Sequence, residues 1–244
     1  MDWFHGELVK LREDMQEHFG VEISDDRLWA SIRLHNETRS LQRQLYELRK
    51  RKRPPISGAD TLAAMVAGTA MPKERYNELL RELLVELRDM EGIGDHRARL
   101  MILGSILDDP AYVRVIEEQG GLVVTDSTCF GSRIMWKDVR EEPGDPLHAL
   151  AQYYVADRHS CPRTFGDRER RAEFVREMIR EFEVDGVIGE RLSFCDQWGF
   201  AQYAIKTDFE EDGIPYLLLE REYILSGVGQ LRTRVQAFLE ALGV

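Results

Sequence analysis

Cysteine is scarce in this chain: its 244 residues include only three, Cys129, Cys161 and Cys195. The number is odd and no two of them form a CxxC pair, so the sequence lacks the disulfide framework that staples small secreted domains. A chain of this length buries a hydrophobic core without such bridges. In a reducing compartment, free thiols either pack inside the core or act as metal and redox ligands.

A long hydrophobic run and an excess of positive charge are also missing. No apolar stretch reaches the roughly 20 residues that span a bilayer, and the N-terminus has no cationic segment followed by an apolar one. The formal net charge is −11, whereas affinity for nucleic acid depends on clustered Lys and Arg. We interpret the basic run 49–53 as a helix C-terminus ended by Pro54. We therefore expect a cytoplasmic protein with no membrane span and no nucleic-acid partner.

The signature motifs of several enzyme classes are absent as well. The chain contains no Walker A loop, GxSxG elbow, HExxH helix or GxGxxG turn. Its six histidines show no metal-ligand spacing. These absences argue against ATP binding, serine hydrolysis and dinucleotide binding by this chain.

The first 95 residues have the apolar periodicity of helices. Apolar residues recur at three- and four-residue spacing over 3–19, and Gly20 ends this first predicted helix. Ser24 has the position of an N-cap for a second, long helix, which the pair Pro54-Pro55 ends. A strong apolar stripe over 76–87 predicts a further helix. This part of the chain is therefore predicted to be almost entirely helical.

From about residue 97, short apolar runs alternate with amphipathic stretches. The runs are continuously apolar, which is typical of strands covered on both faces, and strands separated by helices form a parallel sheet with right-handed crossovers. The predicted strands are 100–103, 122–124, 184–188 and 214–219, and the predicted helices are 109–118, 146–157, 166–182, 197–212 and 228–242. The sequence therefore predicts an α/β fold with two domains. A helical domain, 1–95, precedes a cluster-binding α/β domain, 96–244, built on a doubly wound, four-stranded parallel sheet between two helix layers.

The cysteines fall where such a sheet binds ligands, beyond the carboxyl ends of its strands. Cys129 and Cys195 each follow a predicted strand by a few residues, and Cys161 lies in a polar segment between two predicted helices. Residue chemistry alone leaves a shared metal site and three unrelated buried thiols equally open. Zinc fits less well, because structural zinc sites draw thiolates from closely spaced pairs. Thiolates on separate loops suit an iron–sulfur cluster.

Several segments around and beyond the cysteines form a recognisable pattern. The two most specific are Phe194-Cys195-Asp196 and the run GQLRTRV over 229–235. The others are Ile56–Gly58, Asp126–Arg133, Asp185–Ile188, Gly213–Pro215 and Leu219–Tyr223. Together they resemble the 2-hydroxyacyl-CoA dehydratase/benzoyl-CoA reductase family, over essentially the whole chain.

This resemblance implies low-potential electron chemistry. Members of the family hold oxygen-sensitive iron–sulfur clusters and receive single electrons from an ATP-hydrolysing activator protein. Dehydratases form a ketyl radical on a 2-hydroxyacyl-CoA, reductases dearomatise benzoyl-CoA, and a related branch reduces small molecules at a double-cubane cluster. The implied function is the iron–sulfur component of a reductase or dehydratase (a lyase) acting on acyl-CoA thioesters, with a 4Fe-4S or double-cubane cluster.

The resemblance also implies roles for the cysteines. The position of Cys195 is a cluster ligand in the family, and in the double-cubane branch we expect the positions of Cys129 and Cys161 to be ligands too. Hydrogen bonds to sulfur tune the potential of such clusters. The side chains expected to donate them are Ser127, Thr128 and Ser193, and those expected to shape the pocket mouth are Arg133 and Trp136.

A departure from the family pattern concerns the partner. Family members usually carry a further α/β domain upstream that also donates cysteines, whereas this chain begins in the helical segment that follows it. We therefore expect that a homologous partner subunit supplies that half, or that this is a shortened member. The alternatives are a non-catalytic structural subunit, a fragment of a double-cubane small-molecule reductase, and a plain thiol or zinc protein.

Overall fold

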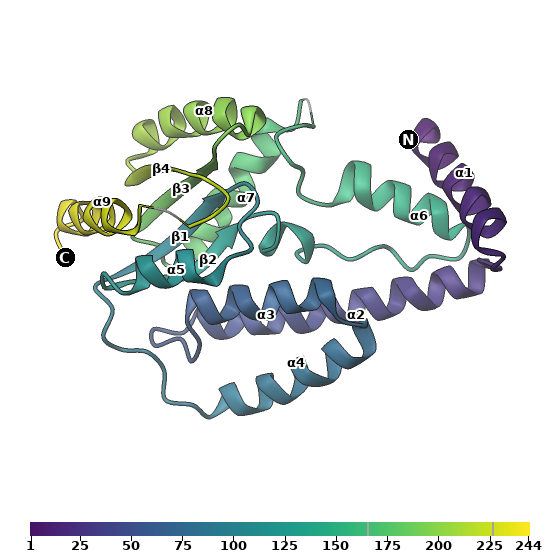
Figure 1. The fold of residues 1–244 in the computed structure, drawn as a ribbon, viewed down its shortest axis with the longest axis horizontal. Coiled ribbons are helices and arrows are strands. Elements are labelled where there is room, and N and C mark those ends of the chain that lie inside the picture. Colours follow the sequence, from purple (N-terminus) through teal and green to yellow (C-terminus); the bar gives the residue numbers. More distant parts are fainter. Residues whose placement is uncertain (165, 226) are drawn as a thin grey trace.

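The fold is seen in a computed structural model that describes residues 1–164, 166–225 and 227–244. Its sheet lies toward one side of the molecule and the N-terminal helix lies at the other, with a long helix running between them (Figure 1). The elements in chain order are α1 (Asp2–Phe19), α2 (Asp25–Arg49), α3 (Gly58–Ala70), α4 (Lys73–Arg88), β1 (Ala98–Gly104), α5 (Pro110–Glu117), β2 (Gly121–Ser127), the 3₁₀ turn η1 (Ser132–Ile134), α6 (Pro146–Gln152), the π-helical turn η2 (Tyr153–Asp157), α7 (Arg168–Glu181), β3 (Gly186–Leu192), α8 (Asp196–Asp212), β4 (Tyr216–Arg221) and α9 (Val228–Ala241).

The strands form one parallel sheet in the order β2-β1-β3-β4. Alternate residues of β1 point to opposite faces: Leu100 and Ile102 pack in a core with α3, α5 and α9. Met101 and Leu103 pack in a second core with α7 and α8. The predicted four-stranded parallel sheet between two helix layers is therefore confirmed.

Two strands extend further than their apolar runs. The run 184–188 predicts a strand that in the structure is β3, ending at Leu192, and the run 214–219 predicts β4, which ends at Arg221. The added ends are charged. They stay in the sheet because Glu190 in β3 forms a buried ion pair with Arg221 in β4.

The N-terminal helices pack directly on the sheet layer. Ser24 caps α2 by accepting from the backbone N–H of Arg27 at 3.4 Å, as its position predicts. Arg49, at the end of α2, is buried and donates to the carbonyl of Val123 in β2 at 2.8 Å. The first residue of the basic run thus belongs to the core. The boundary near residue 95 stays a prediction.

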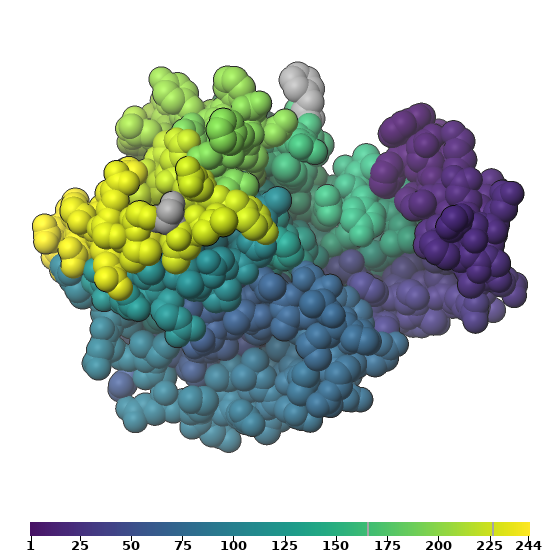
Figure 2. All heavy atoms as spheres, in the orientation of Figure 1, coloured from purple at the N-terminus to yellow at the C-terminus, as the bar shows by residue number. Residues whose placement is uncertain are grey.

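The first helix packs against α6, and its Arg12 also pairs with Asp25 at the start of α2. His5 in α1 and Asp145, the N-cap of α6, approach to 2.6 Å. In the space-filling view, α1 and α9 lie at opposite ends of the molecule (Figure 2). Among the helices of the described residues, none combines the length and apolar character needed to cross a bilayer.

Candidate functional site

The three cysteines lie in three loops at one end of the sheet region. Cys129 follows the end of β2 by two residues, and Cys195 is the N-cap of α8, just beyond β3. Cys161 lies between η2 and α7. All three are half-buried and free. The predicted positions of Cys129 and Cys195 beyond the carboxyl ends of parallel strands are confirmed.

Cys161 and Cys195 both lie near enough to Cys129 to affect its thiol. Burial raises the pKa of the Cys129 thiol, the nearby Arg133 guanidinium opposes this, and both Cys161 and Cys195 raise the pKa further. Because Coulomb interactions weaken with distance, the three thiols share one region of the protein. Among the described residues, however, no three His, Cys, Asp or Glu side chains are placed to hold a single metal ion.

One arginine holds the Cys129 loop in place. Arg133 donates from Nη2 to the Cys129 sulfur at 3.1 Å and to the carbonyl of Gly104 at 3.0 Å. Its Nε donates to the carbonyl of Thr128 at 3.1 Å. Its guanidinium also lies over the ring of Trp198 in α8, at 4.9 Å. A single buried cation therefore joins the ends of β1 and β2 to the start of α8.

The turn that carries Cys129 is built around Asp126. The Asp126 carboxylate accepts from the backbone N–H groups of Thr128 and Ser132, each at 3.1 Å, and from the hydroxyl of Tyr46 in α2. A Cβ on Gly131 would lie 1.6 Å from Asp126 Oδ1, so only glycine fits there. Burial and the adjacent carboxylate hold the pKa of Tyr46 well above its ordinary value, so the phenol remains a donor.

Glu190 is a residue of this region whose role the sequence does not reveal. It is fully buried, and it accepts from Arg221 Nε at 2.6 Å and from the N–H and hydroxyl of Ser105, both at 3.1 Å. Burial raises its pKa, and Arg221 acts against that rise. The carboxylate also raises the pKa of Cys129. The sequence feature that could have revealed this role is a pair of opposite charges just after each of two neighbouring apolar runs, 184–188 and 214–219.

The expected hydrogen bonds from hydroxyl groups to sulfur are wrong for two of the residues named. The Thr128 hydroxyl donates to Asp126 at 3.0 Å, and the Ser193 hydroxyl donates to Glu220 at 3.1 Å. Carboxylates are stronger hydrogen-bond acceptors than thiols, so they accept these hydrogen bonds, and Arg133 donates to the sulfur instead.

Of the two residues expected at the pocket mouth, Arg133 lines the cavity described below and Trp136 does not. Arg133 is buried, with 6% of its surface exposed, where it bonds the Cys129 loop. Trp136 is half-buried against an aromatic group that includes Phe174 and Phe182, with ring centres at 5.8 and 6.4 Å. Both side chains therefore stabilise the layer beside the cysteines.

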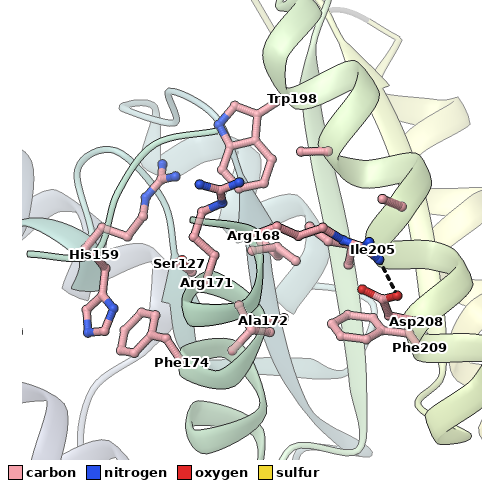
Figure 3. Close-up of a pocket in the computed structure, with 15 residues that line it drawn as sticks. Ser127, His159, Arg168, Arg171, Ala172, Phe174, Trp198, Ile205, Asp208 and Phe209 are labelled. Atoms are coloured by element: carbon pink, nitrogen blue, oxygen red, sulfur yellow. Dashed lines mark hydrogen bonds and ion pairs between the residues drawn. The ribbon is translucent and has the colours of Figure 1, made fainter. Parts of the chain in front are cut away.

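A cavity lies between α7 and α8, close to the Cys129 loop (Figure 3). Its walls are mostly apolar, with Phe174 and Val175 from α7 and Ile205 and Phe209 from α8. Arg133, which bonds the Cys129 sulfur, is also part of its lining. The candidate site therefore combines three grouped thiols, a buried cation and an adjoining apolar cavity.

Comparison with known proteins identifies the family of this chain. The chain matches the family model described as 2-hydroxyglutaryl-CoA dehydratase, D-component, over residues 1–242. It is 35% identical over 243 residues to the YjiM protein of Escherichia coli (strain K12), whose name gives it provisionally as a dehydratase subunit, covering 97% of this chain and 62% of that protein.

Two further relatives have names that state an activity. The chain is 26% identical to the (R)-phenyllactyl-CoA dehydratase beta subunit of Clostridium sporogenes, covering 94% of this chain and 61% of the relative. It is 29% identical to a benzoyl-CoA reductase subunit of Thauera aromatica, covering 88% and 56%. The chain spans about three fifths of the length of the curated relatives it matches. Since the family model matches almost from end to end, as the resemblance predicts, this chain belongs to the 2-hydroxyglutaryl-CoA dehydratase D-component family.

Proposed function

We propose that this chain is the iron–sulfur component of a low-potential reductase or dehydratase acting on acyl-CoA thioesters, with Cys129, Cys161 and Cys195 as cluster ligands. One observation carries the proposal: cysteines from three separate loops lie close enough together for Cys161 and Cys195 to raise the pKa of Cys129. Unrelated thiols in separate parts of the core would not act on one another in this way.

The donor chemistry fits a cluster better than it fits a single ion. Cysteine thiolates are the usual ligands of iron–sulfur clusters, and the different irons of a cluster bind different sulfurs. The sulfurs therefore need not meet at one point, which accords with the lack of a single-ion site among the described residues. When bound, such a cluster supplies single electrons at low potential.

The protein groups around Cys129 have opposing effects on its sulfur. Arg133 stabilises negative charge there, because it donates a hydrogen bond and carries a full positive charge. Burial and the carboxylate of Glu190 act in the other direction. Metal binding requires the thiolate, so Arg133 favours the form of Cys129 that binds iron.

A second, homologous subunit and an activator are part of the proposal. The relatives are named as subunits of dehydratases and of a reductase, and this chain spans only part of their length. Its three cysteines are fewer than the four that commonly ligate a 4Fe-4S cluster. We propose that the assembly is completed by a homologous partner subunit and that an ATP-hydrolysing activator delivers the electron.

Metal analysis of anaerobically purified protein tests the cluster. The chain, co-expressed with its partner, should be brown and contain iron and acid-labile sulfide in near-equal amounts. The variants Cys129→Ser, Cys161→Ser and Cys195→Ser should each lose most of the iron. Ser193→Ala is the matched control in the Cys195 loop, because its hydroxyl bonds Glu220 rather than sulfur, and this variant should keep its iron.

Three outcomes would contradict the proposal. A colourless, iron-free complex under strict anaerobiosis would remove the cluster. Zinc alone in tetrahedral coordination would favour a plain thiol or zinc protein. Full activity of the complex in all three Cys→Ser variants would leave the chain a non-catalytic assembly subunit.

A further inference from the structure

The cavity between α7 and α8 has unused hydrogen-bond donors at one end. Arg133 and Trp198 both line the cavity, and their Nη1 and Nε1 atoms have no hydrogen-bond partner among the described residues. Both side chains are more than nine-tenths buried, with exposed fractions of 6% and 3%. Buried donors without acceptors are costly and rare in folded proteins. An acceptor supplied by a ligand would satisfy both.

The charge around these donors is positive. Figure 3 shows the side chain of Arg171 extending from α7 toward the indole of Trp198. Arg168, at the other side of the cavity, is neutralised by Asp208 at 2.6 Å. Burial lowers the pKa of Arg171, the Asp167 carboxylate opposes this, and the nearby Arg133 lowers the pKa further. One nitrogen of Arg171, Nη1, already donates to the Ser160 hydroxyl and to the carbonyls of Cys161 and Thr164. The missing acceptor should therefore be an anion.

The rest of the cavity favours a ligand with an apolar chain. Phe174 and Val175 on one side and Ile205 and Phe209 on the other form walls that cannot hydrogen-bond through their side chains. An inorganic anion would leave these walls uncovered, whereas a hydrocarbon chain would bury them. Pockets for small molecules commonly combine such walls with a few placed polar groups.

From this arrangement we infer a binding site for a free carboxylate that carries a short apolar chain. Its carboxylate would accept from Arg133 Nη1, from Trp198 Nε1 and from the side of the Arg171 guanidinium that does not bond the Cys161 loop. Its chain would lie between α7 and α8. A carboxylate suits the site because its two oxygens match the fork geometry of guanidinium groups. This site is distinct from the proposed role of the cysteines and does not require iron to be bound there.

Calorimetric titration of the anaerobically purified full chain, with any partner that co-purifies, tests the inference with three probes. Hexanoate has both the head group and the chain, hexanamide has the chain without the charge, and acetate has the charge without the chain. Hexanoate should bind roughly tenfold or more tightly than either of the others, since a charge-assisted hydrogen bond and the buried chain each contribute that much.

Two variants locate the binding. Arg171→Ala should weaken hexanoate binding roughly tenfold, while Arg176→Ala is the matched control on α7, because Arg176 pairs with Asp212 outside the cavity. Ala204→Leu fills the cavity from α8 without changing charge and should also weaken binding. The inference is overturned if hexanamide or acetate binds as tightly as hexanoate, if no saturable binding occurs, or if both cavity variants bind hexanoate like the unaltered chain. Loss of iron in the Cys→Ser variants leaves these results unaffected, so the two proposals fail separately.

Discussion

Replacing Arg221 by methionine should sharply destabilise the protein, because it leaves the buried Glu190 carboxylate without its partner. The side chains of Arg221 and Glu190 are 8% and 0% exposed, and their ion pair measures 2.6 Å. Removing one partner of such a pair typically costs about 3–5 kcal/mol, since the remaining charge stays in a medium of low polarity. We therefore expect Arg221→Met to lower the free energy of unfolding by about 3–5 kcal/mol near neutral pH.

The cost should depend on pH in a defined direction. Burial holds the folded-state pKa of Glu190 above its ordinary value, and Arg221 moderates that rise. A carboxyl whose pKa is raised on folding loses stability as the pH rises through the folded pKa. Without Arg221 the pKa rises further, so the penalty of Arg221→Met should be larger at about pH 8 than at about pH 5.

Urea unfolding followed by circular dichroism measures this effect. Arg191→Met is the matched control, because Arg191 pairs with Glu220 at the surface, where an ion pair contributes less than about 1 kcal/mol. The double variant Glu190→Gln/Arg221→Met should recover much of the loss, since the buried charge is gone. The reasoning is refuted if Arg221→Met costs no more than Arg191→Met, or if the two single changes simply add.

Three further changes test the surroundings of Cys129. Gly131→Ala should destabilise the protein by more than about 1 kcal/mol in urea unfolding, because a Cβ there would overlap the Asp126 carboxylate; an unchanged midpoint would show that the turn can move. Tyr46→Phe removes a donor to Asp126, and should cost about 1–3 kcal/mol, unless water replaces the hydroxyl. Burial lowers the pKa of His159 to about 4, so its contribution to stability should be present above its unfolded pKa of about 6.5 and lost as the pH falls toward 4. The His159→Phe variant should therefore lose less stability in acid. An NMR titration of His159 with a midpoint near pH 6.5 would contradict this prediction.

Local periodicity is enough to predict most of the fold. The apolar runs at 100–103 and 122–124 lie inside β1 and β2, and the helices after them follow from amphipathic spacing. The ends of β3 and β4 are different, because Glu190 and Arg221 are 31 residues apart in the chain and neutralise each other only after folding. Short-range patterns therefore assign these charged residues to loops.

The candidate site, like the sheet, is only partly predictable from the sequence. Placement of Cys129 and Cys195 at strand ends follows from topology, since parallel strands bring their carboxyl ends to one edge. Which group donates to the Cys129 sulfur depends instead on competition between acceptors. Asp126 accepts the hydrogen bond of the Thr128 hydroxyl, so only the three-dimensional arrangement reveals that Arg133 is the donor to sulfur.

The position of Arg133 has a consequence for anyone who would transplant this thiol site into another scaffold. Copying Cys129 with its turn alone would leave the carbonyls of Gly104 and Thr128 without the donor that ties them together. Lysine would not substitute, because an ammonium cannot extend a planar fork to two carbonyls and a sulfur at once. A functional graft must therefore include Arg133, the ends of β1 and β2, and the Trp198 indole that lies against the guanidinium.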